Sequence, residues 1–129
     1  MKGFSTFHST VRYVIGLRKG AHGAGEYQLP GGHLEFFEGF EECCAREVEE
    51  ETGLLIENIW PIAFTNDMFP DDGLHYVTLY FHSDWVSGKP ERREPKRCGG
   101  WIWRALEDFP DRMFVGTLHV RDILLAQKL

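Results

Sequence analysis

Acidic side chains gather in one stretch of the chain, because eight of the twenty Asp and Glu residues fall between Glu35 and Glu51, where the only basic residue is Arg46. On an α-helix, residues four apart share a side, so Glu47 and Glu51 are neighbours and Glu50 lies one step further round. Adjacent carboxylates beside an apolar face repel each other and lose hydration, and a divalent cation removes that cost. Oxygen ligands suit a hard cation, which predicts Mg²⁺, for which Mn²⁺ can substitute.

A solvated acidic helix face, with Glu38 paired to Arg46, is the simpler interpretation of a Glu-rich helix. The spacing argues against it. Gly32 is followed by five residues and Glu38, then by seven residues and the run REVEEETGL at positions 46–54. This spacing resembles the signature of the Nudix hydrolase family at every defined position.

The resemblance implies a fold and a reaction. Nudix proteins hydrolyse a nucleoside diphosphate linked to another group, by attack of water on phosphorus with a divalent metal bound to the signature glutamates. Glu38 and Arg46 are then implied to brace the loop against the helix, and either Glu47 or Glu50 is a candidate base for the water. The implied metal ligands are the Gly32 carbonyl, Glu47, Glu50 and Glu51, and these three glutamates are also the implied catalytic residues.

Wider similarity points to the MutT-related branch of nucleotide triphosphate diphosphatase 15. It rests on residues 18–20, 29–36, 75–78 and 94–95, on the two tryptophans at 101 and 103, and on Phe114 with Gly116. Such enzymes convert nucleoside or deoxynucleoside triphosphates, often with a purine or oxidised guanine base, to monophosphate and pyrophosphate, and they form homodimers. The implied substrate contacts are Arg18 and Arg97 for phosphates, Gly31 for close backbone approach, His33, a base pocket of Leu29, Thr78 and Phe114, and backbone groups at Gly116 and Thr117.

Some positions depart from the family pattern. Relatives usually have Gly where this chain has Phe37, Lys where it has Leu17, and acidic residues where it has Gly99 and Ile102. In related enzymes a loop glutamate can join the metal or act as base. Gly99 has no side chain for that task, and whether Glu94 reaches the site is open.

Two other functions remain as alternatives. One is a nucleoside diphosphate-sugar or ADP-ribose pyrophosphatase, because Pro70 lies near where ADP-ribose enzymes carry a proline, although residues 70–73 also read as an ordinary turn. The other is a nucleotide-binding protein that has lost turnover. A decapping or RNA-binding role is disfavoured, because no basic aromatic platform is present.

Composition limits the remaining choices. A chain of 129 residues with 43% hydrophobic content predicts one domain, residues 1–129. The net charge of -6 argues against nucleic acid and membrane partners, and no signal peptide or apolar run of about 20 residues is present, so we expect a cytoplasmic protein. Residues 35–51 carry a net charge of -7, which leaves a net charge of +1 for the rest of the chain. The three cysteines fit neither a disulfide framework nor a zinc site.

Alternating strand and helix patterns must position the glutamates. Strands are predicted at 4–7, 11–17, 27–29, 59–65, 74–82 and 101–104, with the 70–73 turn closing a hairpin. Helices are predicted at 39–52, capped by Gly53, and at 116–127. Together with the resemblance, this predicts an α/β Nudix fold, an α/β/α sandwich with a central mixed sheet and the loop-helix-loop of the signature.

Overall fold

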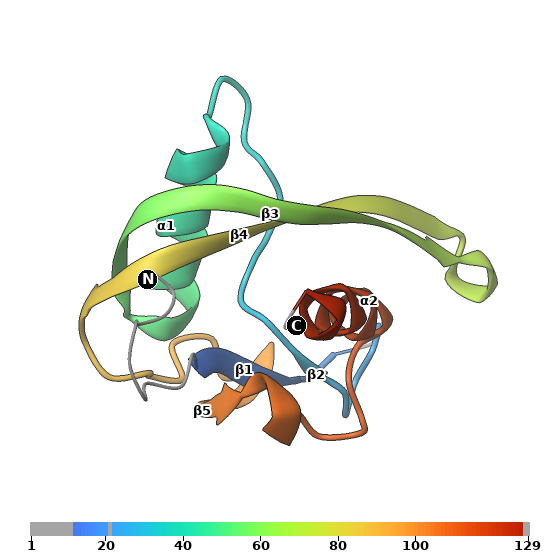
Figure 1. Ribbon diagram of the computed structural model, residues 1–129. Helices are drawn as coiled ribbons and strands as arrows, with labels where there is room; N and C mark the ends of the chain where they lie inside the picture. The colour runs from blue at the N-terminus through green and yellow to red at the C-terminus, as the bar shows by residue number, and fades with distance from the viewer. Residues whose placement is uncertain (1–11, 21, 128–129) are drawn as a thin grey trace.

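The computed structural model describes residues 12–20 and 22–127, which form five β-strands and two α-helices. The strands are β1 (Arg12–Arg18), β2 (Tyr27–Gln28), β3 (Leu55–Phe69), β4 (Leu74–Ser87) and β5 (Cys98–Ala105). The helices are α1 (Phe40–Thr52) and α2 (Val115–Ala126), and 3-10 turns lie at Pro70–Asp72 and Leu106–Asp108. In Figure 1, α2 lies beneath the long hairpin of β3 and β4, and α1 lies against the other end of that hairpin.

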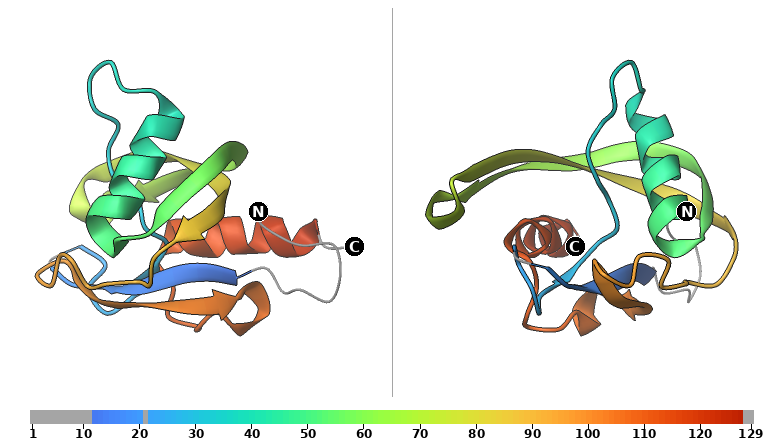
Figure 2. Two further views of the ribbon diagram at one scale, coloured as in Figure 1. Left: turned by 90° about the vertical axis from the view of Figure 1, so that its left-hand side faces the viewer. Right: turned by 180° about the vertical axis from the view of Figure 1, so that it is seen from behind.

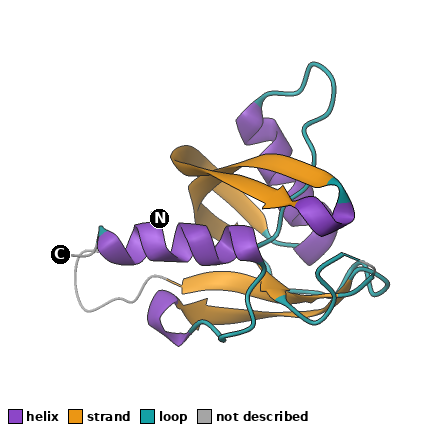
Figure 3. Cartoon of the chain, turned by 90° about the vertical axis from the view of Figure 1, so that its right-hand side faces the viewer, coloured by secondary structure: helices purple, strands orange, loops and turns teal. Residues whose placement is uncertain are grey.

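The described strands form two antiparallel sheets. β1 lies between β2 and β5, with Gly16 opposite Gln28 on one side and Val14 opposite Trp103 on the other. β3 and β4 pair as the hairpin, and α2 lies between the two sheets (Figure 3). The predicted α/β class is confirmed. Within the described part of the chain, the strands divide between two sheets. An isolated parallel bridge joins Tyr27 of β2 to Met113.

The hairpin is longer than the sequence pattern predicted. The alternation predicted a strand from residue 59, but β3 begins at Leu55 and crosses a bulge between Glu57 and Trp60. Asn58 adopts a φ of 51° within this bulge, a conformation that Asn tolerates better than most residues. The bulge interrupts the alternation, which explains why the pattern located only the central part of the strand.

Two hydrophobic clusters hold the layers together. The first joins β1, β5 and the end of α1, and the second packs α2 against its neighbours. Gly16 is required by the first cluster, because a Cβ there would lie 2.5 Å from the Trp101 ring. The buried members are Val14, Leu54, Cys98 and Trp101 in the first cluster and Leu106, Val120 and Leu124 in the second.

The other predicted elements agree with the structure to within a few residues. The helices predicted at 39–52 and 116–127 are α1 and α2, and the strands predicted at 11–17, 27–29 and 101–104 are β1, β2 and β5. The strand predicted at 4–7 lies outside the described residues. No helix in the described ranges has the length and apolar character needed to cross a membrane.

Candidate active site

The C-terminal turn of α1 carries one of its acidic side chains, Glu51, into the protein. The helix stops because Gly53 adopts a left-handed φ of 79°, and its N–H donates to the Glu49 carbonyl at 2.9 Å. The indole N–H of Trp101 donates to the Glu51 carbonyl at 3.1 Å. This contact fixes the last turn against β5 and leaves Glu51 only 9% exposed.

The Glu51 carboxylate is a buried acid. Its Oε2 accepts the Gly31 N–H at 3.2 Å. The pKa of Glu51 is raised to about 8, chiefly by burial and also by the charges of Glu47 and Glu94, while the Gly31 hydrogen bond and Arg97 act in the opposite direction. A carboxylate in such a place needs either a proton or a cation to offset its lost hydration.

Arg46 is surrounded by carboxylates. Its Nε and Nη2 donate to the two oxygens of Glu38 at 2.6 and 2.9 Å, and the hydrogen bond from Arg46 lowers the pKa of Glu38 to about 2. Nη1 donates to Glu47 at 2.7 Å and to Glu50 at 3.3 Å, and Nη2 donates to the His33 carbonyl at 3.2 Å. Arg46 therefore fastens the loop before α1 to the helix and also holds two of the glutamates expected to bind metal. This loop extends away from the rest of the molecule (Figure 2).

The signature glutamates offer the oxygen donors that a divalent metal would require. A Cβ at Gly32 would overlap the Glu47 carboxylate, so only glycine lets these groups approach so closely. In residues 12–20 and 22–127, no three His, Cys, Asp or Glu side chains converge as a metal cluster. Instead, the Glu47 carboxylate accepts a hydrogen bond from Arg46, and the Glu51 carboxylate accepts one from the Gly31 N–H. An all-oxygen set with a buried carboxylate fits Mg²⁺ or Mn²⁺.

These groups border a cleft of about 500 Å³. Glu47 and Glu51 face it together with the basic residues Arg18, Lys19 and Arg97. Carboxylates and cations in one cleft suit a polyphosphate that bridges to a metal. Of the residues predicted for the site, the cleft is lined by Arg18, Gly31, Gly32, His33, Glu47, Glu51 and Arg97.

The remaining predicted residues lie off this cleft. The side chain of Glu50 is 54% exposed and is held by Arg46, and Leu29 packs against the second hydrophobic cluster. Thr117 is only 3% exposed. Phe114 is linked to the cleft through Arg18, whose guanidinium carbon lies 4.1 Å from the centre of the Phe114 ring.

Phe114 belongs to an aromatic cluster that the sequence did not reveal. The Phe69 ring stacks on Phe114 at 5.3 Å, and His22 packs edge-on against both, at 4.6 and 5.4 Å. His22 Nδ1 lies 2.9 Å from Asp72 Oδ2, which ties the loop after β1 to the hairpin turn. The cluster links Arg18, which lines the cleft, to the hairpin through Phe114 and Phe69. No local pattern signals it, because its members are far apart in sequence.

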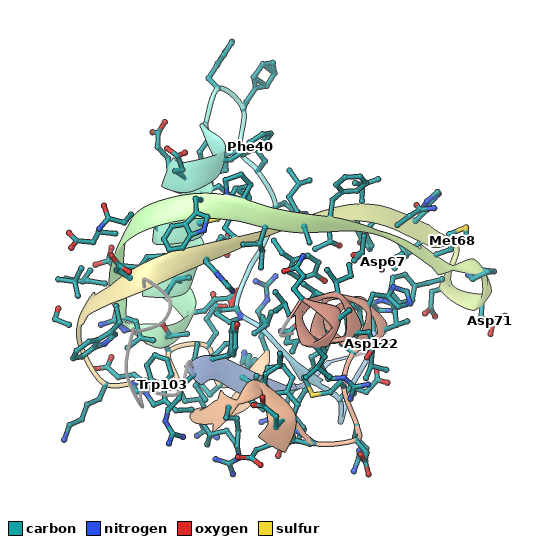
Figure 4. The ribbon with its side chains drawn as sticks, in the orientation of Figure 1. Phe40, Asp67, Met68, Asp71, Trp103 and Asp122 are labelled. Carbon is teal, nitrogen blue, oxygen red and sulfur yellow. The ribbon has the colours of Figure 1, made fainter. Side chains whose placement is uncertain are left out.

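Asp67 is the second buried acid, with 2% of its surface exposed. Its Oδ2 accepts hydrogen bonds from the hydroxyls of Thr65 and Thr78, each at 2.8 Å, and its Oδ1 lies 3.1 Å from His119 Nδ1. A Cβ at Gly116 would lie 2.8 Å from Oδ2. Figure 4 shows Asp67 between the hairpin and α2. Two residues implied for the base pocket, Thr78 and Gly116, therefore meet at an acid that sequence reasoning missed.

Departures from the family pattern have local explanations. Phe37 adopts a φ of 63°, a region that favours glycine, which is the residue that the resemblance leads us to expect there. A Cβ at Gly99 would lie 3.3 Å from Leu17 Cδ2, so the two positions at which the resemblance leads us to expect an acid and a lysine face each other. Here an apolar contact occupies that place. The acid that lines the cleft beside Arg97 is Glu94.

Comparisons with known proteins agree with this geometry. A model of the NUDIX domain matches residues 10–121. The crystal structure of a MutT NUDIX hydrolase from Burkholderia pseudomallei is similar, with a TM-score of 0.81, 31% identity and 86% of each chain covered. A NUDIX hydrolase from Nitrosomonas europaea shares the fold, with a TM-score of 0.72, 21% identity, and 89% of this chain and 81% of that chain covered.

Curated relatives are longer proteins. The NAD-capped RNA hydrolase NudC of Pseudomonas aeruginosa is 32% identical over 106 residues, which cover 81% of this chain and 36% of the relative. The chain thus spans about a third of the length of that protein. The match to the domain model covers most of the described residues, including the glutamate helix and the cleft. The chain belongs to the NUDIX family.

Proposed function

We propose that the chain hydrolyses a phosphoanhydride bond of a nucleotide, with Mg²⁺ or Mn²⁺ held by the Gly32 carbonyl, Glu47, Glu50 and Glu51. The observation that carries this proposal is the cleft in which Glu47 and Glu51 face three cationic side chains. A divalent cation bound there would polarise the phosphate and neutralise its charge. The alternative of a nucleotide-binding protein that has lost turnover is disfavoured, because all three signature glutamates are present.

The side chains of the cleft divide the work. Arg18 is held in place by hydrogen bonds to the Gln28 side chain and the His22 carbonyl, so its charge is positioned for phosphate. Arg97 lies just before β5, and its side chain is 80% exposed and lines the same cleft, where it can contact the polyphosphate. Glu47 lines the cleft, and Glu50 lies off it but accepts a hydrogen bond from the same Arg46 nitrogen as Glu47, so both carboxylates are candidates to accept the proton of the attacking water.

Within this reaction class, we infer a nucleoside or deoxynucleoside triphosphate that is cleaved to monophosphate and pyrophosphate. Three cations around one cleft suit a triphosphate, and the Arg18 contact with Phe114 connects the phosphates to an aromatic surface for a purine, including oxidised guanine. This inference follows the likeness to nucleotide triphosphate diphosphatase 15, which also suggests a homodimer. A cytoplasmic location accords with such a substrate.

The curated relatives support a second candidate. Because proteins named NAD-capped RNA hydrolase are 32% identical over most of this chain, a dinucleotide pyrophosphate such as NAD is a candidate substrate. A nucleoside diphosphate-sugar or ADP-ribose would bind through the same glutamates. The products distinguish these substrates, because only a triphosphate yields pyrophosphate, whereas NAD and ADP-ribose yield AMP.

The test is a substrate panel with product identification. Purified protein is incubated with Mg²⁺ and nucleoside triphosphates, deoxynucleoside triphosphates, NAD or ADP-ribose, and products are separated by ion-exchange chromatography. We expect monophosphate and pyrophosphate, abolished in Glu51→Gln and retained in Glu57→Gln, a control on exposed β3 outside the cleft. No turnover of any phosphoanhydride would refute the proposed reaction, and AMP from NAD with no triphosphate cleavage would replace the preferred substrate.

A further inference from the structure

Two exposed aromatic rings, those of Phe36 and Phe37, form the tip of the loop that precedes α1, and they take no part in the proposed hydrolysis. The rings pack on each other with centroids 4.4 Å apart, yet the two residues remain 84% and 98% exposed. Phe37 also holds a φ of 63°, which is unfavourable for a bulky residue. A strained and exposed ring pair of this kind indicates a contact with another molecule.

The outer face of the hairpin, on the side away from α2, is apolar. Phe64 lies opposite Leu79 in the register of β3 and β4 and is exposed, whereas the next residue, Thr65, is buried. Phe40 lies above the hairpin in Figure 4, and its ring centroid is 6.2 Å from that of Phe81. This outer face borders a hollow of about 590 Å³, whose lining includes Phe40, Pro61, Phe64, Leu79 and Phe81.

The exposed apolar area approaches what a stable complex needs. A whole aromatic side chain offers about 150–250 Å², so the two rings of the tip, with Phe40 at 53% and Phe64 at 72% exposure, present roughly 600 Å². Each partner of a standard interface contributes about 800 Å², whereas the largest patch on a typical monomer is about 300–600 Å². Other exposed apolar residues of the hairpin add to this area: Met68, Val77 and Leu79.

Charge limits the kind of partner. Glu35 and Glu38 flank the tip, and Glu41 lines the hollow. These acids disfavour the anionic surface of a nucleic acid or a membrane. Arg46 pairs with both carboxylates beside the tip, at 3.5 Å for Glu35 and 2.6 Å for Glu38. This pairing reduces the repulsion between the tip and a second acidic surface.

We propose that a second copy of this chain binds here, with the tip of each copy inserted into the hairpin hollow of the other. The loop that carries the tip rises on the side of the hairpin away from α2, the same side as the outer face (Figures 1 and 2). A twofold axis then makes both contacts identical. This inference assigns a surface to the homodimer suggested above. It does not depend on the hydrolysis, because the described residues that line the hollow are not those that line the cleft.

Sedimentation equilibrium over a concentration series measures the dimer. The unmodified protein should reach twice the 14.9 kDa of the chain. Phe37→Gly should raise the dissociation constant at least about tenfold, because a few aromatic anchors carry most of the energy of an interface. Glycine suits the φ at this position, so circular dichroism should show an unchanged fold. Phe64→Ser should weaken the dimer from the side of the hollow, whereas Leu125→Ser, at an exposed apolar position of α2, should not.

Mixing the two variants tests whether the tip contacts the hollow. A heterodimer of Phe37→Gly with Phe64→Ser keeps one undamaged contact between a tip and a hollow, whereas each variant homodimer has two damaged contacts. In native mass spectrometry of an equimolar mixture, the heterodimer should therefore exceed half of all dimers, which is the share expected from random pairing. A heterodimer at or below half would refute the exchange of tips.

Other outcomes also decide the proposal. Raising the salt concentration should not weaken the dimer, because salt screens the repulsion between the acids and leaves the apolar contact intact. A monomer at every concentration, a dissociation constant unchanged by Phe37→Gly or by Phe64→Ser, or a dimer that dissociates in high salt would each overturn it, as would a monomer that cosediments with phosphatidylcholine vesicles. None of these measurements uses turnover, so a failure of the proposed hydrolysis is distinguishable from a failure of this inference.

Discussion

Replacing the buried carboxylate by its neutral isostere, Glu51→Gln, should change how stability depends on pH. The amide oxygen of the variant can still accept the Gly31 N–H that Glu51 accepts at 3.2 Å. The variant has no acid to ionise at this position. Its metal-free form should therefore resist alkaline conditions better than the unmodified protein, while its metal-dependent activity is lost.

The sign and size follow from the pKa of Glu51, which burial raises from 4.5 to about 8. Between these values the folded protein keeps a proton that the unfolded chain has released, so the free energy of unfolding falls as pH rises. At about 1.36 kcal/mol per pKa unit, the gap amounts to a loss of about 5 kcal/mol, complete above about pH 8. Below pH 4.5 both states are protonated, and the carboxyl adds no pH dependence.

Urea denaturation followed by tryptophan fluorescence in EDTA, from pH 4 to pH 9, measures this difference. We expect the unmodified protein to lose several kcal/mol relative to Glu51→Gln across this range, and excess Mg²⁺ at pH 8.5 to restore stability only in the unmodified protein. Two profiles that stay parallel within about 1 kcal/mol would show that the burial of Glu51 does not control its protonation.

Other predictions concern packing and charge. Gly16→Ala should cost about 1–3 kcal/mol in thermal denaturation, because the added Cβ would lie 2.5 Å from the Trp101 ring. Gly99→Glu and Leu17→Lys should each destabilise the protein, but the double variant should recover about 0.5–1 kcal/mol in a double-mutant cycle, and strict additivity would contradict the facing geometry. Since the pKa of Glu38 is lowered to about 2, its contribution to stability should be present above pH 4.5 and lost as pH falls toward 2. An acid titration in which Glu38→Gln matches the unmodified protein would contradict this.

The glutamate helix could be predicted because its signals are local. Helical spacing, the glycine at position 53 and the fixed distances from Gly32 to Glu51 are all visible along the chain. The structure places Gly32, Glu47 and Glu51 around one cleft. The spacing did not reveal that Arg46 reaches Glu47 and Glu50 as well as Glu38, because the choice among nearby acids depends on the geometry of the folded loop.

Long-range contacts could not be read from the sequence. Asp67 meets His119 across 52 positions, and His22 meets Asp72 across 50. A single acid in a strand gives no sign that it is buried, and an aromatic cluster drawn from a loop, a hairpin and a helix N-terminus has no periodicity. The residues expected to line a base pocket, including Thr78 and Phe114, are therefore predicted only through resemblance to a family and not through any pattern of their own.

The two sheets differ in how far apart in the sequence their paired strands lie, and this difference affects the order of folding. β3 and β4 are joined by a short turn, and hairpins of this kind form in about 1–10 μs. In contrast, β1 pairs with β5, which lies near the other end of the chain, and Arg12 is opposite Ala105. Closing so long a loop costs chain entropy, and this cost arises before the favourable contacts between the strands have formed. We expect a hairpin-first pathway in which the β1–β5 pairing is late. Arg18 ends β1 and Arg97 precedes β5, so we expect the part of the cleft that these two residues line to assemble last. A polyphosphate ligand bound there should therefore slow unfolding without speeding folding.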